Sequence, residues 1–346
     1  MTSVLEQLAA AATLPQAAPG WSAQPAPLPL RTHDRTTQPR VAVLIPCCNE
    51  EAAIGKVVTD FHASLPDATI YVYDNNSQDR SVLEARAAGA AVRHEPLRGK
   101  GNVVRRMFAD VEADVYVLVD GDDTYDPKAA PAMLQLLLAR QLDMVTAARV
   151  TREQAAYRRG HRFGNALLTA LVRGVFGDRI SDVLSGYRVF SRRFVKSFPA
   201  LANGFEIETE FTVHALELRM PVGEVTAGYR VRPAGSQSKL HTLSDGLRIL
   251  RTILLLVKEG RPLRFFAATG SALLLAGVAC GTPVVVQFLQ TGLVPRLPSA
   301  VLATGLVLLS SLTLVCGLVL DSVERGRKEI KRLAYLAIAP LPVRDG

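Results

Sequence analysis

The first 150 residues alternate short, continuously apolar runs with segments that have helical spacing. Runs that are apolar throughout indicate strands covered on both faces, as in a parallel sheet. Such strands alternating with helices predict a doubly wound α/β domain. The expected strands cover residues 41–45, 68–74, 91–94, 115–120 and 144–148, and the expected helices cover 50–65, 81–88, 100–110, 127–139, 158–176 and 204–218.

Two uncharged stretches, 265–286 and 297–320, lie near the end of the chain. Each is long enough to cross ~30 Å of hydrocarbon as a helix, and the short link between them predicts a transmembrane hairpin. Lys and Arg cluster outside both stretches, whereas Arg296 alone lies in the link. Because positive residues stay on the cytoplasmic side, we expect a multi-pass protein of the cytoplasmic (inner) membrane with its α/β domain in the cytoplasm.

The segments around these units predict the domain boundaries. Residues 1–12 lack a basic start and contain Glu6, so they are not a signal peptide. A tail rich in Pro, Ala, Gln and Thr follows, and apolar residues in 243–257 with Arg248 and Arg251 on another face indicate an interfacial helix. The expected units are a disordered tail (1–39), the α/β domain (40–240), an amphipathic juxtamembrane helix (241–264), the hairpin (265–320) and a basic cytoplasmic tail (321–346).

The charge distribution and the cysteine content indicate which kinds of partner and which compartment the chain suits. The net charge is +8, but the basic residues gather between 230 and 264, directly before the first apolar stretch. This placement favours anionic headgroups or a lipid phosphate over nucleic acid. The four cysteines show no disulfide framework and suit a reducing compartment. A stripe of small residues, Gly270, Gly277 and Gly281, is compatible with a homo-oligomer.

Polar residues gather where three expected strands end. Asn49 and Glu50 follow the first strand, Asp74 and Asn76 end the second, and the acidic string from Asp120 to Asp126 follows a later one. In doubly wound sheets ligands bind outside the carboxyl ends of the strands. Clustered carboxylates repel one another unless a hard cation joins them, and such oxygen ligands suit Mg²⁺ or Mn²⁺.

Within the acidic string, Asp120 and Asp122 are the natural metal ligands, with Gly121 permitting the turn that brings both to one ion. We expect Asp123 and Asp126 to be structural or to support the metal ligands from outside the ligand shell. Taken alone, the string could equally be an acidic surface turn, since Asp-Gly and Asp-Pro form turns.

Together these motifs resemble the family 2 glycosyltransferases of the dolichyl- or polyprenyl-phosphate sugar synthase type. Asn75 and Asn76 stand where that family has Asp-Gly. The resemblance implies a GT-A-like, mostly parallel sheet. The matching pieces are Ile45 to Glu50, Asp74 to Asp79, Arg98 to Gly101, Asp120 to Asp122 with Pro127, Asp182 with Ser185 to Arg188, and Ser236 to Leu240.

The resemblance also implies a nucleotide-sugar donor, with UDP preferred over GDP, and Mg²⁺ or Mn²⁺. One of Asp120 and Asp122 would act through the ribose side and the other directly on the metal. Asp74 would accept hydrogen bonds from the nucleoside, and Lys100 would lie close to the diphosphate. The remaining donor-pocket candidates are Pro46, Asn49, Glu50 and Asn76.

The acceptor decides whether a base is needed. A lipid monophosphate, with a second pKa near ~6, is largely dianionic at neutral pH and needs cations, whereas a hydroxyl acceptor must lose a proton. Arg232 and Lys239 are the first candidates for the phosphate. Glu210 matches a family acid that either acts as a base or positions a basic residue. The other acceptor candidates are Arg149, Arg158, Arg162, Arg188 and Ser238.

These observations favour an inverting transferase that moves a hexose or N-acetylhexosamine from a nucleotide sugar to polyprenyl (undecaprenyl or dolichyl) phosphate at the cytoplasmic face. A first alternative is a glycan or glycolipid hydroxyl acceptor. Processive synthases of that kind carry a Gln-x-x-Arg-Trp motif, and the single Trp here is Trp21. A second alternative is a membrane protein that binds nucleotide sugars without catalysis.

Overall fold

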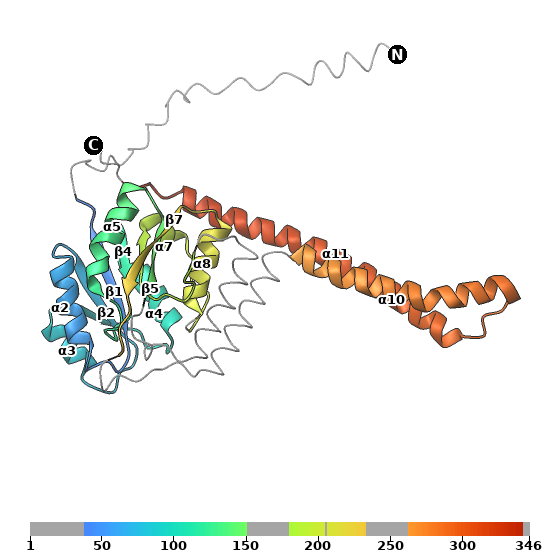
Figure 1. Ribbon diagram of the computed structural model, residues 1–346, viewed down its shortest axis with the longest axis horizontal. Helices are drawn as coiled ribbons and strands as arrows, with labels where there is room; N and C mark the ends of the chain where they lie inside the picture. Colours follow the sequence, from blue (N-terminus) through green and yellow to red (C-terminus); the bar gives the residue numbers. More distant parts are fainter. Residues whose placement is uncertain (1–37, 151–179, 205, 233–261, 342–346) are drawn as a thin grey trace, which may run out of the picture. The chain divides into compact units, whose positions relative to one another are not determined.

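The computed structural model describes residues 38–150, 180–204, 206–232 and 262–341. Its α/β part contains a seven-stranded sheet in the order β3-β2-β1-β4-β6-β5-β7 (Figure 1). The predicted α/β, GT-A-like class is confirmed. The strands are β1 (Val41–Cys47), β2 (Thr69–Asp74), β3 (Ala91–His94), β4 (Val115–Leu118), β5 (Met144–Val150), β6 (Arg188–Ser191) and β7 (Val222–Gly228).

Strand direction determines what meets at the edge of the sheet. β1 pairs in parallel with β2 and β4, so their carboxyl ends share one edge. β6 runs antiparallel to β4 and β5, with Arg188 opposite Leu118 of β4. The segment that precedes β6 therefore lies at the same edge as the residues that follow β4.

Helices cover both faces of the sheet, and each face has its own apolar core. Helix α2 buries Ile54, Val57, Val58 and Phe61, a spacing that aligns them on one side of a helix. The first face carries α2 (Ile54–Ser64), α3 (Ser81–Ala87) and α5 (Ala130–Ala139), and the second carries α4 (Lys100–Asp110), α7 (Arg192–Ser197) and α8 (Ile207–Glu217) (Figure 1).

The expected elements up to residue 150 are all present, with shifted ends. Pro46 does not end the first strand, because it continues to Cys47, which pairs with Asp74. A 3₁₀ turn, η1 (Pro127–Ala129), precedes α5, and the Asp126 side chain accepts a hydrogen bond from the Lys128 amide there. β6, α7 and β7 were not expected from the sequence. The helices expected at 158–176 and 243–257 lie outside the described residues.

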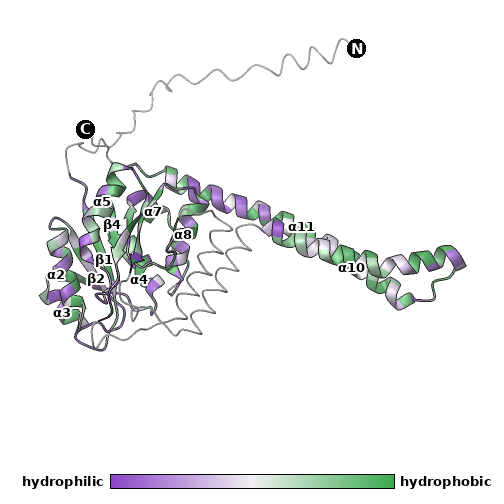
Figure 2. Cartoon of the chain, in the orientation of Figure 1, coloured by the Kyte–Doolittle hydropathy of each residue, from purple (hydrophilic) through white to green (hydrophobic). Residues whose placement is uncertain are grey.

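Two helices, α10 (Pro262–Thr291) and α11 (Leu297–Leu336), are long and apolar enough to cross a membrane. They lie against each other, and Figure 2 shows their largely hydrophobic surface giving way to polar residues in the C-terminal part of α11. The segment expected to be a basic tail from residue 321 is therefore helical as far as Leu336.

Small residues join the two helices of the hairpin. Ser310 Oγ donates a hydrogen bond to the Gly270 carbonyl at 2.8 Å. A side chain at Gly277 would contact Val307 and Leu306, and one at Gly281 would contact Ala303. All three glycines of the predicted oligomer stripe thus face α11 of their own chain, where a close approach of the two backbones requires them.

The polar end of α11 contacts the α/β part. Lys331 Nζ lies 2.9 Å from Glu217 Oε2 at the end of α8, and Tyr335 Oη donates to Asp143 at 2.8 Å. The Arg193 guanidinium of α7 donates to the Ile338 carbonyl at 2.8 Å. These contacts attach the second apolar helix to the second face of the sheet.

Candidate active site

The acidic string after β4 forms the centre of the site. Asp122 is only 4 % exposed, and its carboxylate accepts from Thr124 Oγ1 and pairs with Arg232 Nη2, each at 2.6 Å. Arg232 reaches it because the segment after β7 runs alongside the string, where the Arg230 amide donates to the Thr124 carbonyl. Burial and the neighbouring Asp120 raise the pKa of Asp122, while Arg232 opposes this rise.

Asp120 belongs to a second ionic cluster. The ammonium of Lys100, at the start of α4, donates to Asp120 Oδ1 at 2.5 Å and also to Glu208 Oε1 of α8. Burial of Lys100 lowers its pKa, but the two carboxylates outweigh this and the pKa is raised overall. Burial raises the pKa of Glu208 in turn. Lys100 is therefore a fixed positive charge beside the acidic string.

Glycines allow these groups to approach one another. A Cβ on Gly186 would overlap the Asp120 carboxylate and press on Lys100, and the Gly186 amide donates to Tyr125 Oη at 2.8 Å. Gly121 lies against the Pro46 carbonyl and Ile54. Gly121 provides space rather than a left-handed turn, because Asp123 is the residue of the string with positive φ.

The remaining carboxylates of the string, Asp123 and Asp126, have partners within the protein. Asp123 pairs with Lys56 of α2 at 2.9 Å. Asp126 caps η1 and lies 3.3 Å from Arg230.

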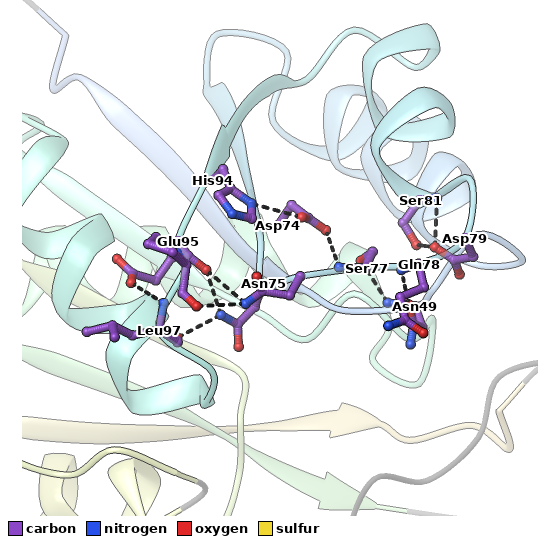
Figure 3. Close-up of polar contacts among 12 residues, drawn as sticks. Asn49, Asp74, Asn75, Ser77, Gln78, Asp79, Ser81, His94, Glu95 and Leu97 are labelled. Atoms are coloured by element: carbon purple, nitrogen blue, oxygen red, sulfur yellow. Dashed lines mark hydrogen bonds and ion pairs between the residues drawn. The ribbon is translucent and has the colours of Figure 1, made fainter.

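The end of β2 forms the neighbouring part of the edge (Figure 3). Asp74 accepts from the Ser77 amide with one oxygen, and its other oxygen lies 3.1 Å from His94 Nδ1. The Asn75 side chain donates to the carbonyls of Glu95 and Leu97 and accepts from the Gly99 amide, each at 2.8 Å. Asn75 thereby links the end of β2 to the loop that leads to Lys100.

The loop after β1 is joined to the loop after β2. The Asn49 amide donates to Ser77 Oγ at 2.9 Å, and Asn49 Oδ1 accepts from the Gln78 amide at 2.7 Å (Figure 3). Glu50 is buried, and its amide donates to Ser81 Oγ. The predicted donor-pocket residues Pro46, Asn49, Glu50, Asp74, Asn76 and Lys100 therefore all lie on the strand ends or loops of one edge.

Two of the arginines predicted for the acceptor phosphate have structural partners. Arg188 is fully buried, and its guanidinium donates to the carbonyls of Val183, Ser185 and Glu208 and to Thr212 Oγ1. The expectation that it contacts the acceptor is wrong, because its position inside the core removes it from any ligand.

Arg149 makes a two-pronged pair with Asp182 at 2.7 and 2.8 Å and lies over the Tyr229 ring. Burial of Asp182 raises its pKa, but Arg149 outweighs this and lowers it overall. The pair attaches the segment before β6 to the end of β5. Arg158, Arg162, Ser238 and Lys239 lie outside the described residues.

Glu210 does not join the ionic cluster. Its carboxylate accepts from the amides of Leu201 and Ala202 at 3.0 and 2.8 Å, and burial raises its pKa. The acid that meets Lys100 is Glu208, which sequence reasoning missed. Residues two positions apart on a helix project about 200° apart, so Glu208 and Glu210 cannot both contact the same partner. The sequence spacing therefore predicts that one of these acids contacts Lys100, but it does not tell which one.

The donor set suits a divalent metal ion. Asp120, Asp122 and Glu208 gather around two cations, and Glu50 lies near enough to raise the pKa of Asp122. Among the residues that the structure describes, no group of three His, Cys, Asp or Glu could hold a metal on its own. Phosphate oxygens of a donor would complete the shell, as Mg²⁺ and Mn²⁺ prefer. Asp120 and Asp122 would be the protein ligands.

Comparisons with known proteins show which family and which proteins this chain is similar to. The family described as Glycosyl transferase family 2 matches residues 42–198. Protein RfbJ of Shigella flexneri is 56 % identical over 123 residues, which are 35 % of this chain and 95 % of that protein. The dolichyl-phosphate hexose transferase of Haloferax volcanii is 27 % identical over 221 residues, which are 64 % of this chain and 95 % of that protein.

A solved structure is similar as well. Glucosyl-3-phosphoglycerate synthase of Mycobacterium tuberculosis, in complex with Mn²⁺ and UDP-glucose, aligns with a TM-score of 0.53 and 25 % identity over 64 % of this chain and 80 % of that chain. On the family match, the relatives and the GT-A-like sheet, the chain belongs to glycosyltransferase family 2.

Proposed function

We propose that this glycosyltransferase moves a hexose or N-acetylhexosamine from a UDP-sugar to a polyprenyl phosphate at the cytoplasmic membrane face, with inversion. The observation that carries the proposal is that two helices of membrane-crossing length belong to the same chain as the donor-type edge, and that the second of them contacts the α/β part. A relative named for transfer of hexose to dolichyl phosphate supports it, as does the neighbouring structure that holds Mn²⁺ and UDP-glucose.

On the donor side, Asp74 accepts hydrogen bonds from the nucleoside, and the loops after β1 and β2 shape the pocket. Asp120 and Asp122 would hold Mg²⁺ or Mn²⁺ together with the diphosphate. The bound ion would stabilise the negative charge that develops on the departing diphosphate. Lys100 adds a second, fixed positive charge on the same group, and its raised pKa keeps it protonated at neutral pH.

On the acceptor side, the lipid phosphate supplies its own nucleophile. One of its oxygens forms the new bond to the anomeric carbon while the diphosphate leaves from the opposite face, so no proton has to be removed. Arg232, which pairs with Asp122 of the acidic string, would orient this phosphate. Arginine suits this role because its guanidinium can bind phosphate in a bidentate manner. The Glu210 carboxylate is engaged by two backbone amides, which argues against a role as a base.

The test uses full-length protein in membranes, with a panel of radiolabelled UDP-sugars, Mn²⁺ and polyprenyl phosphate. We expect one sugar to enter the lipid fraction, and Asp122→Asn to lower this transfer by about 10²–10³-fold. Asp126→Asn, in the same string but at the cap of η1, is the matched control and should retain activity.

Three results would overturn the proposal. One is undiminished transfer by Asp122→Asn in the presence of EDTA. Another is transfer to a glycan or glycolipid hydroxyl with none to the lipid phosphate. The third is tight binding of UDP-sugar without turnover in the presence of every acceptor, which would indicate a non-catalytic binding protein.

A further inference from the structure

Lys100 has two acidic partners, and they differ in their surroundings. The side chains of Lys100 and Glu208 are 8 % and 7 % exposed, whereas that of Asp120 is 29 % exposed. One ammonium thus lies between a carboxylate of the protein interior and a carboxylate that faces the site. The two carboxylates and the one ammonium together leave one negative charge. Because Asp120 is the more exposed of the two acids, it is the carboxylate that can interact with a ligand.

The backbone of Glu208, the buried partner, is hydrogen-bonded to Arg188. The Glu208 carbonyl accepts from Arg188 Nη2 at 3.0 Å, and the same guanidinium holds the carbonyls of Val183 and Ser185. Arg188 is itself fully buried. The start of α8 and the segment carrying Gly186 are therefore fixed to each other on two sides of the Lys100–Asp120 pair.

The start of α4 is held just as closely. The Gly101 amide donates to the Asn203 carbonyl at 3.1 Å, and a Cβ on Gly101 would overlap the Ala202 carbonyl. The Glu210 carboxylate holds the amides of Leu201 and Ala202 in this same loop. Backbone contacts thus place Lys100 within reach of Glu208.

We propose that Glu208 is a positioning residue that shares the Lys100 ammonium with Asp120, so that Asp120 keeps enough negative charge to hold the metal-bound diphosphate of the donor. With Asp120 as its single partner, Lys100 would neutralise that carboxylate. With Glu208 present, the Lys100 ammonium has a second anchor, so that Asp120 can turn to the donor. The inference rests on the proposed function and extends it to a residue behind the site.

The experiment measures binding of Mn²⁺ and UDP to detergent-solubilised full-length protein by calorimetry, with no acceptor present. Glu208→Gln keeps the size of the side chain and removes its charge. We expect Mn²⁺–UDP affinity to fall by about 10–100-fold, the range found for residues that orient metal ligands. Glu208→Asp keeps the charge on a shorter side chain and should lie between wild type and Glu208→Gln. Glu206→Gln, in the same acidic turn, is the matched control and should bind within about twofold of wild type.

A double-mutant cycle with Lys100→Met tests whether Glu208 acts through Lys100. We expect Glu208→Gln to cause no further loss of Mn²⁺–UDP affinity in the Lys100→Met background. Full additivity of the two losses, or wild-type affinity in Glu208→Gln, would overturn the proposal. If Glu208→Gln does not fold by circular dichroism, Glu208→Asp decides: wild-type affinity in that variant also overturns it. Because the binding experiment contains no acceptor, its result can be interpreted even if the protein does not transfer sugar to the lipid.

Discussion

Three polar residues with left-handed backbone lie in the loops that follow the site strands. Asn49, Asn76 and Asp123 have φ of 51°, 63° and 55°. Asn and Asp are the residues other than Gly that tolerate this region best, because their short side chains bond to nearby backbone. Asn76 stands where the related family has Gly, so the departure from the motif preserves the backbone conformation. The motif match at this loop therefore reflects geometry as well as chemistry.

Gly186 packs closely against the two charged side chains at the centre of the site. Gly186→Ala places a methyl group against Asp120 and Lys100. We expect at least a tenfold loss of kcat/KM for the donor and about 1–3 kcal/mol of destabilisation, as in overpacked interiors. Gly55→Ala on α2, where the added carbon meets only ordinary contacts, is the control. Unchanged kinetics in Gly186→Ala would contradict the packing described here.

His214 gives the α/β part a calculable pH dependence. Burial of His214 against the rings of Phe194 in α7 and Phe198 just after it lowers its pKa to about 4 from 6.5. Since the unfolded chain binds a proton below pH 6.5 and the folded chain does not until about pH 4, stability is full above pH 6.5 and falls between these values. The loss should approach about 3 kcal/mol, at ~1.4 kcal/mol per pH unit.

Chemical denaturation at several pH values measures this effect. His214→Gln should flatten the dependence between pH 6.5 and 4, whereas His62→Gln on α2 should leave it as in the wild type. An equally steep loss in His214→Gln would assign the effect to other groups.

At the scale of elements, the direction of β6 determines the composition of the site. Because β6 is antiparallel to β4, the residues before it return to the edge where β1, β2 and β4 end. Gly186 and the Arg149–Asp182 pair reach the site region in this way. β6 has four residues and begins with a buried arginine, so its pattern resembles neither a continuous apolar run nor an alternating strand.

The hairpin helices make their own testable contact. Gly277→Leu would insert a side chain between α10 and α11, against Val307 and Leu306, whereas Gly305→Leu points into open space. We expect Gly277→Leu to lower the free energy of unfolding in detergent by about 1–3 kcal/mol and Gly305→Leu to change it little. Thermal melting of the two variants compares them directly. An effect confined to Gly305→Leu would place the helix contact elsewhere.

At the scale of the whole molecule, the polar end of α11 joins the apolar hairpin to the catalytic part. Glu217 is 7 % exposed in its side chain and faces Lys331 and Lys328. Tyr335 reaches Asp143, whose other oxygen accepts from Ser191 Oγ at the end of β6. The site strands and the apolar helices are thus linked through side chains near α7 and α8.

Charge reversal tests this junction. Glu217→Lys places like charges together and should lower the free energy of unfolding by about 1–4 kcal/mol. This range lies between the effects found for exposed and for buried ion pairs. We expect faster proteolysis of the chain after residue 336 and a lower melting temperature in detergent. The double variant Glu217→Lys with Lys331→Glu should recover much of the loss. No recovery in the double variant would indicate that α11 is held by contacts other than this pair.

Local pattern alone determined the strand and helix alternation up to residue 150, the two apolar helices and the acidic string, because each depends on residues adjacent in the chain. It could not determine that Glu208 rather than Glu210 pairs with Lys100, or that Arg188 is buried and hydrogen-bonded inside the core. Those assignments depend on which helix face packs on the sheet and on the reversed direction of β6. Contacts between residues that are distant in the chain leave no periodic pattern in the sequence, so only the tertiary structure decided them.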